Sequence, residues 1–323
     1  MEHIESTPKP TVEPEPEPIT NPLSGETIDE DISSKRPYAI MINNISVAQP
    51  HCGVSGADII YEVLAEGDIT RMLAIYSDLE NVGPIGSMRS SRPYYIELAM
   101  SYDAIYVHAG GSEQAYSDIA SKGVNNIDGV RGAYADDIFY RDSSRQKYGT
   151  EHSLFTSSEK LLEYTPTLGY SPEHNSNYNY GLLFTDEPTM GDSAAIASSV
   201  NVSFSGLKNT DFTFHPDTGL YTGRQFGNDY IDGNTDETIG FKNLLVLFAD
   251  TQIIDNDGRR TVDLVGSGEG YFICGGLSIP ICWTRSGSGA PFIYAREDGS
   301  ELELGVGKSY IAIVPTESEI TME

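Results

Sequence analysis

A compact set of cationic and hydroxyl residues could recognise an anion: Arg89, Ser90, Ser91 and Arg92. Pro93 follows them, and proline is favoured in the first turn of a helix, so we predict a helix over 93–102 with Ser91 as N-cap. Free backbone N–H groups at a helix start attract anions, and arginine adds paired hydrogen bonds to a carboxylate or phosphate. The alternative is that both arginines form internal ion pairs with acids such as Glu62 or Glu66.

A second set of small and polar residues follows the short buried strand that we predict over 104–107: His108, Gly110, Gly111 and Ser112. Another helix is predicted over 113–122, ended by Gly123. In open α/β sheets, ligands bind beyond the carboxyl ends of the strands. The two sets are therefore predicted to line one crevice, where His108 would donate to an anion or act in acid/base chemistry. The alternative is a histidine hydrogen-bonded to the backbone.

Two carboxylates flank the same predicted sheet. Glu62 and Glu66 fall within a predicted strand over 57–66 and would share one face of it, about 13 Å apart. Glycosidase mechanisms place their two carboxyl groups about 5–9.5 Å apart. Salt bridges to Arg71, Arg89 or Arg92 are therefore the favoured interpretation. We expect Arg141, Asp142 and His152 to add to the rim of the crevice, the alternative for Arg141 and Asp142 being a pair that fixes its own loop.

The charge of the chain limits its partners. The 323 residues carry a net charge of −28, from 48 acidic and 20 basic side chains, which disfavours binding to nucleic acid or to anionic lipid. No metal site is predicted, because the three cysteines show no C-x-x-C spacing. No cofactor site is predicted, because the glycine-rich segments 266–270 and 305–309 lead into predicted strands instead of helices. Cys274 and Cys282 could pair across a hairpin, the alternative being two buried thiols.

The composition along the chain changes twice. Residues 1–35 include alternating Glu and Pro over 13–18, which predicts a disordered acidic tether. Residues 36–185 alternate buried strands with helices and predict an α/β domain with a mixed sheet. Residues 186–323 show short apolar runs between turns such as 255–258, typical of a mostly antiparallel β domain, a sandwich or a barrel.

The chain shows no apolar run of the roughly 20 residues that a membrane span requires, and no export signal is visible after Met1. Two interpretations remain open at this point. The protein is cytosolic, or Met1 replaces an export signal that was removed.

Several long segments are similar to the YerB-like bacterial lipoproteins, a two-domain family of unknown function: 21–25 (NPLSG), 36–44 (RPYAIMINN), 57–67 (ADIIYEVLAEG) with 69–71 (ITR), 83–93 (GPIGSMRSSRP), 102–112 (YDAIYVHAGGS), 266–270 (GSGEG) and 307–315 (GKSYIAIVP). The resemblance spans nearly the whole folded part. It implies an exported protein anchored to the cell membrane by a lipidated cysteine near its mature N-terminus. This chain departs from that pattern, because its first cysteine, Cys52, lies inside the first domain.

The resemblance brings no established reaction, so three functional hypotheses are carried forward. The leading one is a non-enzymatic envelope protein that binds an anionic small molecule, a wall-polymer fragment or an envelope protein partner through Arg89, Arg92 and His108. The second is a hydrolase or transferase acting on envelope glycan, with Glu62, Glu66 or His108 in acid/base roles. The third is a scaffold that uses the surface of the β domain.

Overall fold

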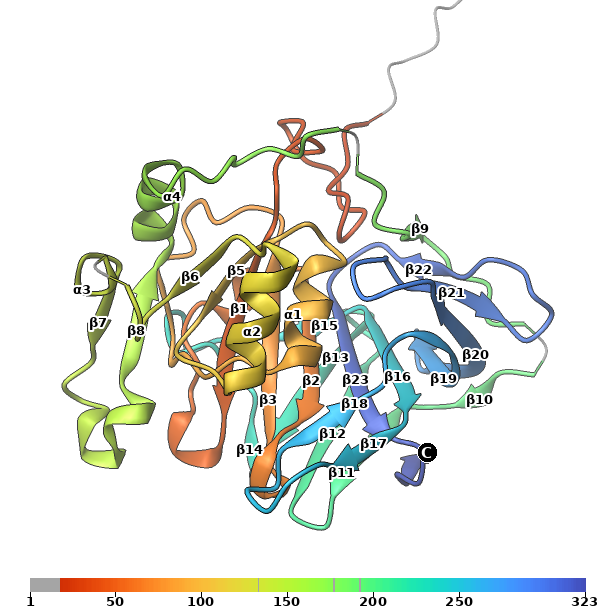
Figure 1. The fold of residues 1–323 in the computed structure, drawn as a ribbon. Helices are drawn as coiled ribbons and strands as arrows, with labels where there is room; N and C mark the ends of the chain where they lie inside the picture. Colours follow the sequence, from red (N-terminus) through yellow and green to blue (C-terminus); the bar gives the residue numbers. More distant parts are fainter. Residues whose placement is uncertain (1–17, 133, 177, 192) are drawn as a thin grey trace, which may run out of the picture.

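One large mixed β-sheet organises the backbone (Figure 1). The computed structural model describes residues 18–132, 134–176, 178–191 and 193–323. Within these residues, eleven strands form the sheet, in the order β10 (Ala195–Ile196), β20 (Leu277–Arg285), β19 (Gly266–Cys274), β16 (Asn243–Ala249), β23 (Ser309–Pro315), β2 (Ile59–Leu64), β3 (Thr70–Tyr76), β1 (Tyr38–Asn44), β5 (Ile105–His108) and β6 (Asn126–Asp128), with β21 (Ile293–Arg296) beside β20.

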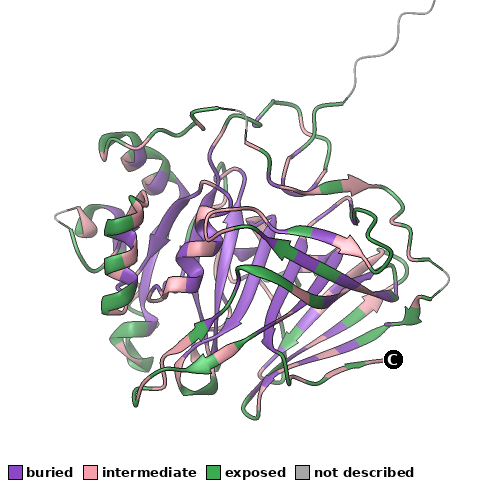
Figure 2. Cartoon of the chain, turned by 45° about the vertical axis from the view of Figure 1, so that its right-hand side comes forward, coloured by how far each residue is buried: buried purple, intermediate pink, exposed green. Residues whose placement is uncertain are grey.

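The central strands are buried along their whole length, as Figure 2 shows. Continuous apolar runs are typical of strands covered on both faces. Strand β23, from the C-terminal half, pairs in parallel with β2, so both halves of the chain contribute to the same sheet. The domain boundary that we predicted at residue 185 stays a prediction.

Each face of the large sheet is covered by a different layer. Helices α1 (Pro93–Met100) and α2 (Glu113–Lys122) pack on one face. A second sheet packs on the other, with strands β14 (Asn228–Asp229), β13 (Leu220–Gln225), β12 (Lys208–His215), β11 (Ser199–Ser205) and β24 (Ile320–Met322), and with β15 (Gly240–Phe241) beside β13. The predicted class is confirmed: an α/β N-terminal part precedes a mostly antiparallel, sandwich-like β part.

The remaining elements are short. The small strands are β4 (Pro84–Gly86), β7 (Phe139–Arg141), β8 (Leu154–Ser157), β9 (Leu183–Thr185), β17 (Thr251–Ile253), β18 (Arg260–Val262) and β22 (Glu303–Gly305), and the other helices are α3 (Ala135–Ile138) and α4 (Ser158–Thr167). The 3-10 turns are Ser46–Ala48, Val54–Gly56, Glu66–Asp68, Gln146–Tyr148 and Thr150–His152. None of the described helices combines the length and the apolar character that a membrane span requires.

Part of the predicted tether is packed against the fold. Leu23 is fully buried in the core on the helix side of the large sheet. Asn21 Nδ2 donates to Asp58 Oδ1 at 2.7 Å and to Ser77 Oγ at 2.9 Å. The prediction of an unpacked tether is therefore wrong for the packed part of residues 18–35, because polar side chains there replace water with protein partners. Residues 1–17, which contain the Pro–Glu run, lie outside the described residues.

The cysteines are free thiols. Cys274 is buried and stands opposite Leu277 in the β19–β20 hairpin, whereas Cys282 is exposed and stands opposite Glu269. A disulfide between them is therefore excluded in this fold by the hairpin register. The alternative of two buried thiols is right for Cys274 alone.

A buried histidine predicts acid sensitivity. His51 is fully buried, with Nε2 2.8 Å from Asn43 O and Nδ1 3.1 Å from the Tyr230 hydroxyl, and burial lowers its pKa from 6.5 to about 4. In the unfolded chain His51 therefore becomes protonated below pH 6.5, whereas in the native protein it stays neutral down to about pH 4. We expect the free energy of unfolding to fall by about 3 kcal/mol between these pH values through this group alone.

Urea denaturation at half-unit pH steps measures this effect. His51→Gln should reduce the slope of this dependence between pH 6.5 and 5, leaving the contributions of His108 and His152, whereas His215→Gln, a control at a partly exposed histidine, should leave the slope unchanged. Parallel curves for wild type and His51→Gln would show that another group causes the acid sensitivity.

Candidate functional site

The segment 89–92 lies beyond the carboxyl end of β5 and begins beside the second half of the parallel strand β1, near the edge where the sequence predicted a crevice. The backbone N–H of Arg89 donates to Met41 O at 3.1 Å, and the Arg89 carbonyl accepts from Ala109 N–H at 3.0 Å. Ser91 N–H donates to Gly110 O at 2.8 Å. The two predicted loops therefore lie side by side at this edge of the sheet.

Two arginines pair with one inner carboxylate at this edge, and a third arginine, Arg89, lies near them. Arg71 and Arg92 both pair with Glu66: Arg71 Nη2 lies 2.7 Å from Glu66 Oε2, and Arg92 Nε donates to Glu66 Oε1. We call Arg71, Arg89, Arg92 and Glu66 the arginine cluster. Burial would raise the pKa of Glu66, but the hydrogen bond from Arg92 and the charge of Arg71 outweigh it and hold this pKa below its ordinary value. The predicted salt bridges from the arginines thus involve Glu66, not Glu62.

Arg89 differs from its two neighbours. Its guanidinium has neither an ion pair nor a hydrogen bond among the residues that the structure describes, and its Nε is buried. Burial, followed by the positive charge of Arg71, lowers the pKa of Arg89, while the carboxylates of Glu151 and Glu66 oppose the shift. The cluster therefore holds more positive charge than its inner carboxylate balances.

His152 borders the cluster, and its predicted place at the rim of a crevice stays a prediction. Asn43 Nδ2 lies 2.9 Å from His152 Nδ1, and His152 Nε2 lies 3.6 Å from the half-exposed Glu151. Burial lowers the pKa of His152; Glu151 opposes the shift and Arg89 adds to it. Sequence reasoning missed Asn43, although a polar Asn at the end of a buried apolar strand is an unusual feature that could have indicated it.

Arg141 and Asp142, the other predicted rim residues, hold their own loop. Arg141 Nη1 donates to Thr150 O, and Asp142 Oδ1 accepts from Ser144 N–H at 2.8 Å. Their side chains are thus used within residues 141–150.

The serines and glycines of the two loops are used in hydrogen bonds and backbone geometry within the fold. Ser91 is fully buried and its Oγ accepts from the Tyr106 hydroxyl at 2.8 Å, so Arg92 instead of Ser91 occupies the N-cap position of α1. Ser112 Oγ caps α2 by accepting from Ala115 N–H. The other three residues contribute through their backbones. The carbonyl of Ser90 accepts a hydrogen bond from Arg71 Nη1, Gly110 adopts a φ of +74°, and Gly111 forms a β-bridge with Ser91.

His108 does not reach an open crevice, which corrects the prediction. Its side chain is fully buried, with Nδ1 2.8 Å from Gly110 O and Nε2 3.0 Å from Asn126 Nδ2. The ring also stacks on Tyr106, at 5.0 Å between centroids. Burial lowers the pKa of His108, the nearby Asp128 opposing the shift. The alternative interpretation, a histidine bonded to backbone, is the one that the structure shows.

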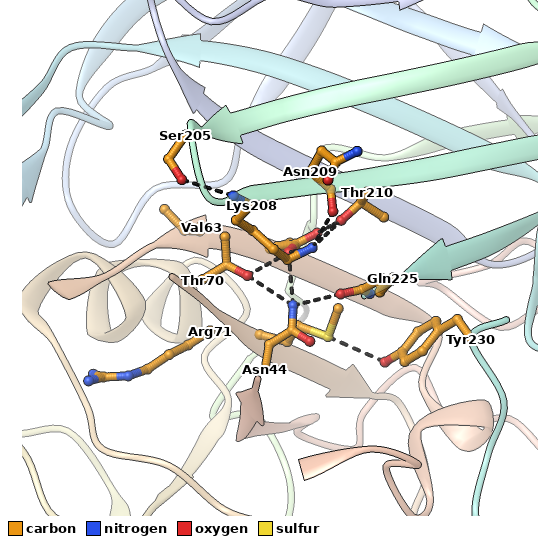
Figure 3. A network of polar contacts seen from close by, with 12 residues as sticks. Asn44, Val63, Thr70, Arg71, Ser205, Lys208, Asn209, Thr210, Gln225 and Tyr230 are labelled. Atoms are coloured by element: carbon orange, nitrogen blue, oxygen red, sulfur yellow. Dashed lines mark hydrogen bonds and ion pairs between the residues drawn. The ribbon is translucent and has the colours of Figure 1, made fainter. Parts of the chain in front are cut away.

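Glu62 lies on the opposite face of the sheet from the cluster, so the prediction that Glu62 and Glu66 share a strand face is wrong. Strand β2 ends at Leu64, and Glu66 lies in the following 3-10 turn. Glu62 is fully buried between the two sheets, where its Oε1 lies 2.8 Å from Lys208 Nζ. Figure 3 shows Lys208 within this network and Arg71 extending away from it.

The network around Glu62 joins the two sheets. Its other hydrogen-bond donors to the carboxylate share complete burial and come from both sheets: Asn44, Thr70, Thr210 and Tyr310. Burial lowers the pKa of Lys208, and the charge of Glu62 opposes the shift. Glu62 is therefore sealed from solvent and from any polymeric substrate.

A hairpin of the C-terminal half reaches the cluster. Arg260, in β18, donates from Nε to Ala65 O at 3.0 Å and pairs with Asp68, so it holds the turn that carries Glu66. The preceding residues 255–258 form a turn, as predicted, with Asp255 Oδ1 accepting from Arg259 N–H at 3.0 Å. Sequence reasoning missed Arg260; two adjacent arginines in so acidic a chain were the available indication.

The two halves of the chain match the two domains of one known protein family. Residues 23–171 match the family model described as the N-terminal domain of a protein of unknown function (DUF3048), and residues 200–311 match its C-terminal domain. YerB of Bacillus subtilis (strain 168), which is named as a lipoprotein, is 30% identical over 298 residues, 91% of this chain and 86% of that protein.

A crystal structure of the YerB protein from Bacillus subtilis is similar to this one. The TM-score is 0.80 at 28% sequence identity, and the match covers 94% of this chain and 99% of the other. Both domains of the family, the whole-length relative and the shared fold agree with the resemblance drawn from the sequence. The chain therefore belongs to the DUF3048 family of YerB-like proteins, whose function is not established.

Proposed function

We propose that this chain is the extracytoplasmic part of a cell-envelope lipoprotein and that it binds an anionic ligand at the arginine cluster without transforming it. The lipoprotein name of its relative supports the placement. The observation that carries the binding proposal is the excess of cationic side chains: Arg71 and Arg92 both pair with the carboxylate of Glu66, and Arg89 near them has no ion pair in the described structure.

The chemistry of the cluster favours a carboxylate or a phosphate. A guanidinium offers a planar fork of donors that matches both groups, and Arg89 keeps this fork without an acidic partner in the described structure. The net charge of −28 repels anions elsewhere on the surface, so a locally cationic site would be selective. A wall-polymer fragment, a small organic anion or an acidic segment of an envelope protein would each supply such a group.

The hydrolase alternative has weaker support from the geometry. Glu62 is sealed between two sheets, both ring nitrogens of His108 have partners, and Glu66 is held by two arginines. A general acid or base must reach the proton that it transfers. We therefore favour ligand binding over glycan cleavage. A scaffold role is distinguished from ligand binding by the melting-temperature screen and by co-purification of a protein partner.

A melting-temperature screen tests the proposal. The panel holds phosphate, sugar phosphates, muropeptides, teichoic-acid fragments and dicarboxylates. A ligand at 100 times its dissociation constant should stabilise the native protein by about 2.7 kcal/mol, a rise of several degrees. Arg89→Met should abolish the rise while leaving the Arg71–Glu66–Arg92 pairs in place, because Arg89 takes no part in them.

Arg296→Met is the matched control, since Arg296 is another partly buried arginine and lies on the distant edge strand β21. It should keep the ligand response. If no member of the panel raises the melting temperature of the wild type, the anion site is refuted. A protein partner that still co-purifies with Arg89→Met would then favour the scaffold interpretation.

A further inference from the structure

A pocket of about 270 Å³ opens beside Arg92, between the two helices of the N-terminal half and the β17–β18 hairpin of the C-terminal half. Its lining includes residues from α1, from α2 and from the hairpin, among them Arg92, Tyr94, Ser112, Ile254, Thr261 and Val262. We call it the hairpin pocket. Because Arg92 belongs to both the lining and the arginine cluster, the hairpin pocket and the anion site adjoin.

The hairpin pocket offers apolar surface to a ligand. Ile254 is 57% exposed at the hairpin, and the partly exposed Pro93 adds further apolar atoms, whereas Tyr94 and Val262 line the pocket as buried residues. Covering such surface favours binding by about 25 cal/mol for each Å² removed from water. A purely inorganic anion would leave this surface wet, so the pocket favours a ligand with an organic body.

Most charged groups around the hairpin pocket already have partners. Lys122 Nζ lies 3.3 Å from Glu97 and 3.8 Å from Asp118, and Arg259 pairs with Asp255 and Asp257 at 2.9 Å each.

Arg92 is different from these groups. Its Nε is used by Glu66 and its Nη1 by Ser91 O, at 2.6 Å for the latter, whereas its Nη2 has no hydrogen bond within the described ranges. Arg92, which lines the hairpin pocket, therefore has a donor to offer an anion.

The size of the hairpin pocket limits the ligand. A cavity of about 150 Å³ is enough to hold benzene, so 270 Å³ accommodates one substituted ring. We propose that the hairpin pocket binds the ring-sized apolar body of an organic anion whose phosphate or carboxylate group contacts Arg92. This inference rests on the proposed function for the anion and adds the organic body and the role of the hairpin.

Four anions separate the contribution of the ring to binding from that of the anionic group: phosphate and phenyl phosphate, acetate and benzoate. Each is titrated into the full chain and followed by NMR. We expect the ring to tighten binding at least tenfold within the phosphate pair or the carboxylate pair, and the pair that shows it identifies the anionic group. Thr261→Trp places a large side chain into the hairpin pocket from an exposed strand position and should remove the preference for the ring. Thr213→Trp, at an exposed strand position of the second sheet, should retain it.

The outcomes distinguish this inference from the proposed function. Equal dissociation constants within both pairs, or a ring preference that survives Thr261→Trp, would overturn the inference and leave the anion site standing. Benzyl alcohol binding as tightly as benzoate and phenyl phosphate would overturn it as well, because the anion would then contribute nothing. Failure of all four anions to bind the wild type would overturn both proposals.

Discussion

Lys208→Met should lower the free energy of unfolding by about 3–5 kcal/mol at pH 7, because it leaves a buried carboxylate without its counter-charge. The side chain of Lys208 is 2% exposed and its Nζ lies 2.8 Å from Glu62 Oε1, while the Glu62 side chain is fully buried. Lys208 Nζ also donates to Asn209 O at 2.9 Å. Methionine keeps the length of the side chain and removes the charge, so urea denaturation of the variant reports the electrostatic loss.

Two further variants separate the ion pair from simple packing. Glu62→Gln combined with Lys208→Met removes both charges and should recover at least half of the lost stability, since a neutral pair is cheaper to bury than a single charge. Lys160→Met removes a lysine that is 45% exposed and should change stability by less than about 0.5 kcal/mol. A loss below about 1 kcal/mol for Lys208→Met would contradict the view that this ion pair is sealed.

Glu66→Gln should destabilise the protein by about 2–4 kcal/mol at low ionic strength, because it leaves Arg71 and Arg92 without an acid partner inside the cluster. Their side chains are 5% and 12% exposed, so water compensates poorly for the lost carboxylate. The three guanidinium charges would also repel one another. Millimolar sulfate or phosphate should restore part of the stability, because an anion would take the place of the missing charge.

The control for this experiment is Glu163→Gln, at an acid that is 61% exposed and pairs with Lys160. This variant should lose little stability, and sulfate should not specifically raise its melting temperature. Thermal melts in chloride and in sulfate at equal ionic strength separate anion binding from general salt effects, since sulfate stabilises many proteins by exclusion from their surface. An equal sulfate response in both variants would remove the support for an anion site at the cluster.

Local features of the sequence predicted the elements well. The apolar runs at 38–42 and 72–76 became β1 and β3, and Pro93 and Gly123 mark the start of α1 and the end of α2. These features act through neighbouring residues, because proline fixes its own φ and glycine permits the left-handed helix end.

The sequence could not place the site in the same detail. Every residue of β2 is buried, so alternation along the strand did not reveal that Glu62 points away from the face that carries Arg71. The hydrogen bond from Tyr106 that diverts Ser91 from capping crosses between segments that are not adjacent in the chain. The pairing of Arg92 with Glu66, and the isolation of Arg89, depend in the same way on tertiary contacts that no local pattern encodes.

Because β23 lies between β2 and β16, the large sheet can be completed only late in the synthesis of the chain. Ile59 pairs with Ser309, so one edge of β2 stays open until almost all of the remaining chain has been synthesised. An open strand edge is a template for unwanted pairing. A polypeptide that ends before residue 309 would lack the strand that closes the sheet, and the cell would handle it as an unfinished chain, not as a smaller working version of the protein.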